Sequence, residues 1–228
     1  MKPRYMIHTV PERETYVRGF LIPRLMEQGI PKSRIKIWLD DRHAGNLVST
    51  MTSFLWCGEK NKGKTWHLQD DVLPSVAFAD QAEWYADLYP VVCGFVPNKT
   101  YDGETGEPGS IVRPIDMPYS FPCILIDDAL AQECARWFLY HDGGFGLVVN
   151  ALVREGKGDD TLFRRFLTEE HPDTEVRILS PCLVQHVDDL LGGSVINPDR
   201  DFPIRARVWE DQGEMEQLTE WLGRERKE

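Results

Sequence analysis

The chain has 228 residues, of which 42% are hydrophobic and 28% charged, and its formal net charge is −11. This length and balance suit one α/β domain with a sizeable core, and they exclude disordered and fibrous proteins. The acidic balance argues against a broad basic face for nucleic acid, and it favours a cation at any site that binds an anionic nucleotide.

Targeting and redox signals favour a cytoplasmic protein without a membrane span. No apolar run approaches the roughly 18 residues that cross a bilayer. The N-terminal residues 1–10 lack the apolar segment of a signal peptide. The five cysteines are widely spaced and form no CxxC pair, which predicts reduced thiols rather than a disulfide framework or a zinc ribbon.

Strand-like and helix-like segments alternate along the first half of the chain. Short apolar runs predict strands over 5–10, 34–39, 65–68 and 91–96. Apolar residues at helical spacing predict helices over 14–28, 46–56 and 76–89, with a kink or an early break at Pro23 and a polar turn over 58–64. This repetition is typical of a largely parallel sheet covered by helices.

The regular pattern stops at Pro97. Residues 97–122 are rich in Gly, Pro, Asp and Asn, which predicts a long loop or irregular hairpin that could close over a ligand. Beyond it, the spacing predicts helices over 128–140, 145–154, 161–167 and 214–222, a strand over 176–179, and a charged tail over 223–228 that frays.

Asp70 and Asp71 form the strongest chemical signal. They stand at the carboxyl end of a predicted strand, the edge where open parallel sheets bind ligands. Two adjacent carboxylates there need a cation or hydrogen-bond donors to offset their repulsion. Mg²⁺ or Mn²⁺, which prefer hard oxygen ligands, could bridge them to a diphosphate. The alternative is a solvated turn in which one carboxylate caps the next helix.

Two later segments carry further candidate groups. His186 follows the last predicted strand and could supply an imidazole ligand, although a lone histidine is more often structural. Asp159 and Asp160 directly precede the amphipathic helix over 161–167. Either carboxylate could serve as the helix N-cap or as a catalytic group.

In this order, these segments resemble the GT-A glycosyltransferases, and the similarity spans residues 5–194. Gln69-Asp70-Asp71-Val72 looks like the acidic metal motif of that family, written as Asp-x-Asp or Glu-Asp-Asp. The stretch 181–186, Pro-Cys-Leu-Val-Gln-His, resembles the family's Pro-Ser-Leu-Val-Gln-His, whose histidine completes the metal site. Gly158-Asp159-Asp160 is similar to the acidic motif that opens the acceptor-side helix.

The resemblance implies a GT-A-like, Rossmann-related α/β/α sandwich of three layers with a mainly parallel central sheet. We expect one domain over 1–228, in which 1–96 bind the nucleotide sugar, 97–210 form the acceptor side and 211–228 form a C-terminal helix and tail. Metal-dependent sugar transfer from a nucleoside-diphosphate sugar to a hydroxyl acceptor follows as the expected activity. The acceptor could be a glycan, a lipid-linked sugar, a protein, a small metabolite or a modified nucleobase.

The resemblance also assigns residues to roles. Asp71 and His186 would hold Mn²⁺ or Mg²⁺. Asp160 or Asp159 would take the acceptor proton if the enzyme is inverting. The residues expected to bind the nucleotide sugar are Thr9, Val10, Pro11, Arg13, Asp40, Gln69 and Asp70.

The chain departs from the family pattern at several positions. Gln69 replaces an acidic residue, Cys182 stands where serine is common, and Val187-Asp188-Asp189 stands where relatives often have glycine and serine. A nucleotidyltransferase would also use paired carboxylates and a metal, but residues 9–14 contain no glycine for the expected phosphate loop. A catalytically silent nucleotide-sugar-binding protein is a third hypothesis, which the Gln69 substitution makes possible.

Overall fold

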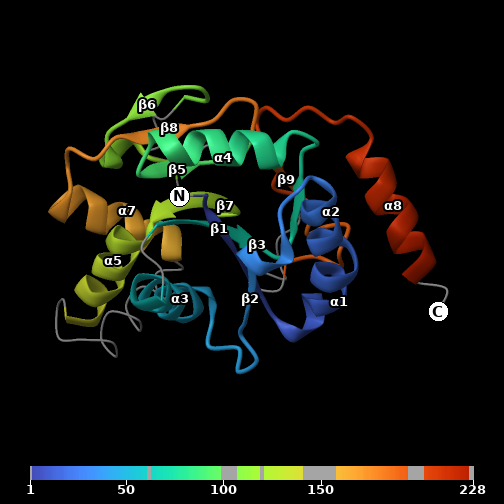
Figure 1. Ribbon diagram of the computed structural model, residues 1–228, viewed down its shortest axis with the longest axis horizontal. Helices are drawn as coiled ribbons and strands as arrows, with labels where there is room; N and C mark the ends of the chain where they lie inside the picture. The colour runs from blue at the N-terminus through green and yellow to red at the C-terminus, as the bar shows by residue number, and fades with distance from the viewer. Residues whose placement is uncertain are drawn as a thin grey trace.

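The computed structural model describes residues 2–60, 63–98, 107–118, 121–140, 158–194 and 203–225. A seven-stranded sheet crosses the centre of the molecule (Figure 1) in the order β2-β1-β3-β7-β5-β8-β6. Its strands are β1 Arg4–Thr9, β2 Ile35–Leu39, β3 Lys64–Gln69, β5 Val91–Cys93, β6 Ile111–Val112, β7 Cys123–Asp127 and β8 Val176–Ile178. A separate two-stranded sheet pairs β4 Val72–Pro74 with β9 Val184–His186.

The central sheet is mixed but mostly parallel. β1 runs parallel to both β2 and β3, and β5 runs parallel to β8. β7 is antiparallel to its neighbours β3 and β5, and β6 is antiparallel to β8. The predicted α/β class with a mainly parallel sheet is confirmed at this level.

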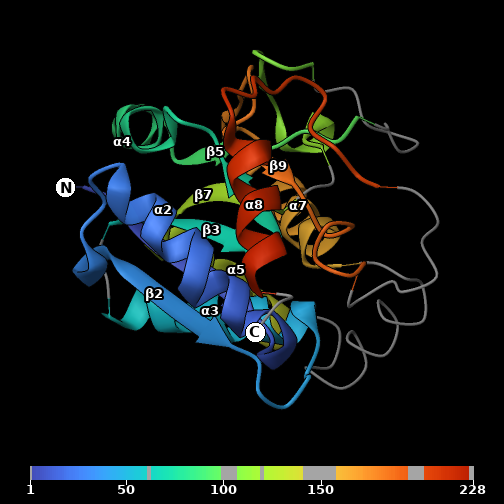
Figure 2. The same cartoon turned by 90° about the vertical axis from the view of Figure 1, so that its right-hand side faces the viewer.

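Helices cover both faces of the sheet. They are α1 Glu14–Tyr16, α2 Ile22–Glu27, α3 Asn46–Lys60, α4 Phe78–Leu88, α5 Asp128–Tyr140, α7 Asp159–Glu170 and α8 Glu214–Glu225, together with 3₁₀ turns at Pro11–Arg13, Lys32–Arg34 and Pro114–Asp116. Adjacent residues of β3 show the layering, because side chains alternate between the faces of a strand. The Trp66 indole donates to the Ala82 carbonyl of α4 at 3.0 Å, whereas the His67 ring lies 4.8 Å from the Phe54 ring of α3. α4 therefore covers one face, and α3 with α5 covers the other (Figures 1 and 2).

The first helix continues through Pro23 by way of a π-helical segment. Pro23 cannot donate to the carbonyl four residues earlier, and the π segment Val17–Leu21 lies directly before α2. The predicted irregularity at Pro23 thus takes the form of a wider turn rather than a break. The helix ends at Glu27, and Gly29 follows two residues later with a φ of +90° that suits glycine.

Several local predictions are wrong. The turn expected over 58–64 begins too early, because α3 continues to Lys60. The strands β7 and β9 were not predicted, although the first four residues of β7 form an apolar run of the kind found in a buried strand. The described parts of 97–122 contain β6 and the 3₁₀ turn at Pro114–Asp116, and α8 extends three residues beyond its predicted end at Leu222. The helix predicted over 145–154 lies outside the described residues.

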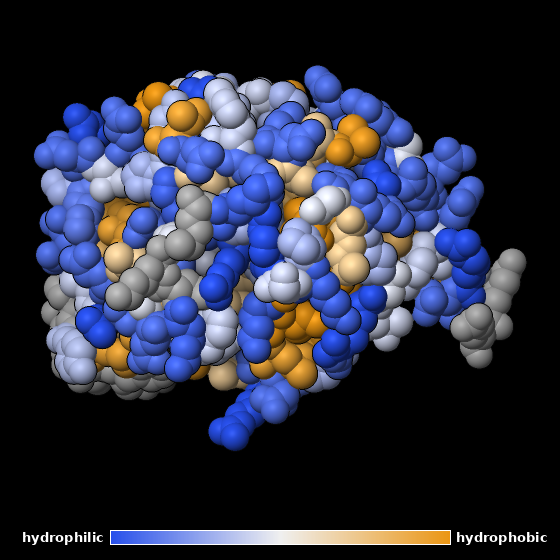
Figure 3. Space-filling model, viewed as in Figure 1, coloured by the Kyte–Doolittle hydropathy of each residue, from blue (hydrophilic) through white to orange (hydrophobic). Residues whose placement is uncertain are grey.

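The C-terminal helix α8 packs beside α1 and α2 (Figure 2). The Trp221 ring lies 5.9 Å from Tyr16 and 5.6 Å from Phe20. Among the described residues, no helix combines the length and apolar character needed to span a bilayer. Hydrophilic side chains dominate the face seen in Figure 3, with smaller hydrophobic patches between them.

Candidate functional site

A cavity of about 370 Å³ opens at the carboxyl edge of β1, β2 and β3. β1 lies between β2 and β3. The chain passes from β1 to β2 on one side of β1 and then, through α3, to β3 on the other side, so the strand order reverses direction at β1. Open α/β sheets bind ligands at such a point. The described residues that line the cavity are His8, Thr9, Val10, Asp40, His43, Gly45, Asn46, Ser49, Thr50, His67, Gln69, Asp70, Asp71, Phe121, Asp159 and Ser194.

Asp70 joins the end of β3 to the end of β1. Its Oδ2 accepts the backbone N–H of Val10 at 3.1 Å. Burial, followed by repulsion from Asp71, raises the pKa of Asp70 to about 7, while the Thr9 hydroxyl and the Val10 N–H oppose this rise. The two adjacent carboxyl groups therefore resist carrying two full charges unless a cation offsets them.

Asp71 lies against His186 because of the small sheet. β4 and β9 are antiparallel with Val72 opposite His186, and the N–H of Val187 donates to the Asp71 carbonyl at 2.8 Å. This pairing leaves Asp71 Oδ1 3.4 Å from His186 Nε2. The structure thus brings together the two residues that the sequence predicts as metal ligands.

Asp188 is a third member of this cluster, and it is not among the residues predicted from the sequence. Its Oδ1 lies 3.0 Å from His186 Nδ1, and its side chain is 1% exposed. Ligand atoms of Asp71, His186 and Asp188 lie within 4.8 Å of one another. The sequence marked Asp188 only as a departure from the family pattern, so the signal was present but interpreted differently.

The donor chemistry of this Asp–His–Asp cluster fits a divalent cation. Asp71 Oδ1 is buried and accepts no hydrogen bond from the described residues. Asp188 faces one imidazole nitrogen and so orients the other toward Asp71, the arrangement in which a carboxylate fixes the ring of a metal-binding histidine. Carboxylate oxygens suit Mg²⁺ and Mn²⁺, whereas imidazole suits transition metals such as Zn²⁺ and Fe²⁺, so this donor set fits several divalent cations.

Asp159 and Asp160 separate into two different environments. Asp159 lines the cavity, where its carboxylate accepts from the Thr50 hydroxyl at 2.7 Å and from the Asn46 amide at 3.3 Å. Burial, followed by the nearby Asp160 charge, raises the pKa of Asp159 to about 7. Asp160 is not among the lining residues, and its Oδ1 accepts the Thr161 N–H at 2.6 Å within the first turn of α7.

The residues predicted to bind the nucleotide sugar divide in the same way. Thr9, Val10, Asp40, Gln69 and Asp70 line the cavity, whereas Pro11 and Arg13 do not.

Asp40 also shapes its own loop. Its carboxylate accepts the backbone N–H groups of Ala44 at 2.9 Å and Gly45 at 3.0 Å. Gly45 in turn lies directly before α3, which supplies Asn46, Ser49 and Thr50 to the wall. Asp40 thereby fixes the entry into this helix.

His8 and His67 were missed altogether. They lie on neighbouring strands and line the cavity, with His8 Nε2 2.9 Å from His67 Nδ1. Burial lowers the pKa of His8 to about 4 and that of His67 well below its usual value, so both imidazoles are neutral near pH 7. Neither residue stands in a recognisable motif, and only the pairing of β1 with β3 brings them together.

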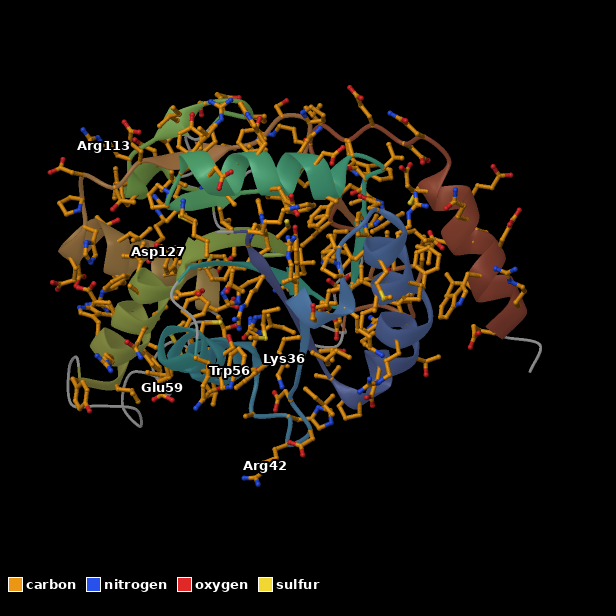
Figure 4. The ribbon with its side chains drawn as sticks, viewed as in Figure 1. Lys36, Arg42, Trp56, Glu59, Arg113 and Asp127 are labelled. Carbon is orange, nitrogen blue, oxygen red and sulfur yellow. The ribbon has the colours of Figure 1, made fainter. Side chains whose placement is uncertain are left out.

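Acidic groups dominate the described cavity wall. It includes Asp40, Asp70, Asp71 and Asp159 but no lysine or arginine. Arg42, in the loop after β2, points away from the body of the molecule (Figure 4). An anionic ligand would therefore need a cation in this part of the cavity. No tryptophan lines the described wall, so none is placed there to stack on a sugar or a base. Trp56 packs against Lys36, whose Nζ lies 5.5 Å from the ring centroid (Figure 4).

No model of a known protein family matches this chain, and no curated protein sequence matches it. A buried Asp–His–Asp cluster beside a second carboxyl group can hold a cation and a ligand that the cation neutralises. A carboxyl group with a pKa of about 7, at Asp159, can exchange a proton near neutral pH.

Proposed function

We propose that the protein is a metal-dependent glycosyltransferase that moves a sugar from a nucleoside-diphosphate sugar to a hydroxyl acceptor. One observation carries the proposal: the Asp71–His186–Asp188 cluster meets a cavity at the carboxyl edge of β1 and β3 through Asp71, which lines that cavity together with Asp70, while His186 and Asp188 are buried behind the wall. The order of the acidic and histidine motifs, which resembles the GT-A pattern, supports it.

The donor diphosphate would lie at the cluster. A Mn²⁺ or Mg²⁺ ion held by Asp71 and His186 would neutralise the charge that develops on the departing diphosphate, an effect generally worth several kcal/mol. Asp188 keeps the His186 ring in place, and the Val10 N–H keeps the Asp70 carboxyl at the end of β1. The neutral His8–His67 pair and the Asp40 loop would border the uncharged parts of the donor.

Asp159 is the better candidate for the catalytic base. It lines the cavity and has a pKa of about 7, so it is largely deprotonated above neutral pH. In an inverting transfer, the acceptor oxygen bonds to the anomeric carbon as the bond to the diphosphate breaks, and Asp159 takes the acceptor proton. The hydrogen bonds from Thr50 and Asn46 hold the carboxylate for this step.

A thermal-shift screen tests the donor and the metal together. UDP-, GDP-, CMP- and dTDP-sugars are added with and without Mn²⁺ to the wild type and to Asp71→Asn. The exposed residue Asp87 on α4 offers a control variant, Asp87→Asn. We expect one donor to raise the melting temperature only with Mn²⁺, because the proposed cation offsets the charge of the diphosphate at the acidic site. A ligand at 100 times its Kd stabilises the native state by about 2.7 kcal/mol, which sets the size of the shift. Asp71→Asn should abolish the shift, and Asp87→Asn should retain it.

Other outcomes point elsewhere. No shift with any donor in folded protein contradicts the proposal. A metal-dependent shift followed by transfer of a nucleoside monophosphate group would indicate a nucleotidyltransferase. Donor binding without hydrolysis or transfer, across a broad acceptor panel, would indicate a silent nucleotide-sugar-binding protein.

A further inference from the structure

Arg13 connects the loop that follows β1 to the turn that follows β9. It ends the 3₁₀ turn that follows β1, and it is only 4% exposed. Its guanidinium donates to the carbonyl of Leu191 at 2.5 Å and to the carbonyl of Gly193. The side chain expected to bind a nucleotide sugar is thus committed to backbone nearly 180 residues away.

The turn that Arg13 contacts begins at Asp188, a member of the Asp71–His186–Asp188 cluster. The Asp188 carbonyl accepts the N–H groups of Leu191 at 3.0 Å and Gly193 at 2.8 Å, which closes a tight turn. Gly192 and Gly193 both have positive φ, at +99° and +96°. Because consecutive glycines can adopt many backbone conformations, this turn needs contacts from outside it to stay in a single conformation. The next residue, Ser194, lines the cavity.

We propose that Arg13 is a positioning residue for the Asp71–His186–Asp188 cluster. Its two terminal guanidinium nitrogens donate to carbonyl groups of the turn that follows Asp188 and so fix that turn. The Asp188 carboxylate then stays next to His186, and the imidazole stays oriented toward Asp71. The planar fork of arginine suits this task, because it presents two donors to two carbonyl groups at once. The inference rests on the proposed metal-dependent function.

A purely electrostatic role for Arg13 predicts the opposite result. Its positive charge acts through space on Asp70, so its removal would leave the cavity more negative. A more negative cavity attracts a divalent cation more strongly. Loss of the hold on the turn instead loosens Asp188 and weakens metal binding. The sign of the change in affinity therefore separates the two explanations.

Mn²⁺ titration, followed by the electron paramagnetic resonance signal of the free ion, supplies the measurement. The variants are Arg13→Ala, Arg13→Lys and the control Arg34→Ala. Arg34 is also largely buried, and it donates to the backbone carbonyl of Pro3 at 2.9 Å. It lies at the amino ends of β1 and β2, whereas the cavity lies at their carboxyl ends. We expect Arg13→Ala to weaken Mn²⁺ binding about tenfold, as loss of an outer-shell partner typically does. Arg34→Ala should leave it within about twofold of wild type.

Arg13→Lys keeps the charge but loses the fork, so it should bind Mn²⁺ nearly as weakly as Arg13→Ala. Full recovery of affinity in Arg13→Lys, or unchanged or tighter binding in Arg13→Ala, would overturn the proposal. Amide hydrogen exchange without metal gives a second readout. Exchange over residues 187–193 should accelerate in both Arg13 variants and not in Arg34→Ala, and equal exchange in all variants would also overturn it.

The two proposals fail in distinguishable ways. A wild type that binds no Mn²⁺ contradicts the metal-dependent function, and the positioning role falls with it. A wild type that binds Mn²⁺, with Arg13 variants that bind it equally well, contradicts the positioning role alone.

Discussion

Asp159 owes its chemistry to its neighbours on α3. Its carboxylate accepts hydrogen bonds from Thr50 and Asn46, and it is 5% exposed. The hydrogen bond from Thr50 favours the charged form, but burial and the Asp160 charge outweigh it and raise the pKa to about 7. A carboxyl group of this kind costs folding free energy whenever it must ionise.

The stability of the protein should therefore depend on pH through Asp159. Its folded pKa lies above the value of about 3.9 in an unfolded chain, so the folded state binds more protons between pH 4 and pH 7. Stability then falls as pH rises through this window, by up to about 1.4 kcal/mol per pH unit. Urea unfolding of wild type and Asp159→Asn at a series of pH values should show the wild type losing stability relative to the variant up to about pH 7.

The difference between the two proteins isolates this effect. His8 and His67 have lowered pKa values and act in the opposite direction below pH 6.5, but both proteins carry them. Asp173→Asn provides a control for the substitution itself, because that side chain is 95% exposed. A difference between wild type and Asp159→Asn that does not change with pH would contradict the raised pKa of Asp159.

At the residue scale, the sequence predicted the groups that stand in motifs. Asp71 and His186 belong to short patterns whose chemistry is recognisable, and the structure brings them together. The His8–His67 contact depends on strand register, which no local pattern records. Arg13 looked like a ligand-binding cation after β1, but both of its terminal guanidinium nitrogens donate to carbonyl groups of a distant turn.

At the element scale, the long periodic helices and the first three strands of the sheet were predicted well, whereas β7 and β9 were missed. The predicted bounds of α5, residues 128–140, agree with the structure. β9 has only three residues, too few to show a period, and β7 follows a loop-like stretch without a break in the pattern. The antiparallel placement of β7 between β3 and β5 is a tertiary property that strand-by-strand analysis does not reach.

Gly58 illustrates how packing decides a residue that looked like a turn signal. It lies within α3, where a Cβ atom would meet the Gln132 Cβ of α5 at 2.2 Å. That atom is fixed to the α5 backbone, so the two helices would have to separate. We expect Gly58→Ala to destabilise the protein by about 1–3 kcal/mol despite the better helix propensity of alanine, as overpacking typically does.

Gly223 gives the matched control in α8, because nothing lies within 4 Å of its added Cβ. Gly223→Ala should stabilise by about 0.5–1 kcal/mol through helix propensity alone. Urea unfolding of both variants measures the two changes. Equal effects of the same sign would show that the close approach of α3 and α5 is not what places glycine at position 58.

At the scale of the whole molecule, the two halves expected from the sequence share one core. β3 from the first half pairs with β7 from the second, and β5 pairs with β7 and β8. The buried hydrophobic residues form one continuous cluster that includes members of both halves. Among the described residues, 1–96 and 97–210 therefore share one hydrophobic core. If the chain is one domain, as expected from the sequence, both parts should unfold together.

The cysteines provide a test of this unity, because all five are buried thiols outside any disulfide. They are spread over the fold at Cys57 on α3, Cys93 on β5, Cys123 on β7, Cys134 on α5 and Cys182 after β8. Burial raises the pKa of Cys93 to about 12 and also raises the pKa of Cys123, Cys134 and Cys182. Because the thiolate is the reactive form, native protein should react very slowly with a thiol reagent.

Brief labelling with such a reagent across a urea series, followed by mass analysis of each peptide, should give the same midpoint for all five cysteines. That midpoint should also coincide with the loss of far-UV circular dichroism, because coincident transitions are the mark of a cooperative unit. Labelling of Cys134 and Cys182 at lower urea than Cys57 would contradict a single core and would indicate that the second half opens first. Labelling of any cysteine in native buffer at the rate of a free thiol would instead contradict its burial.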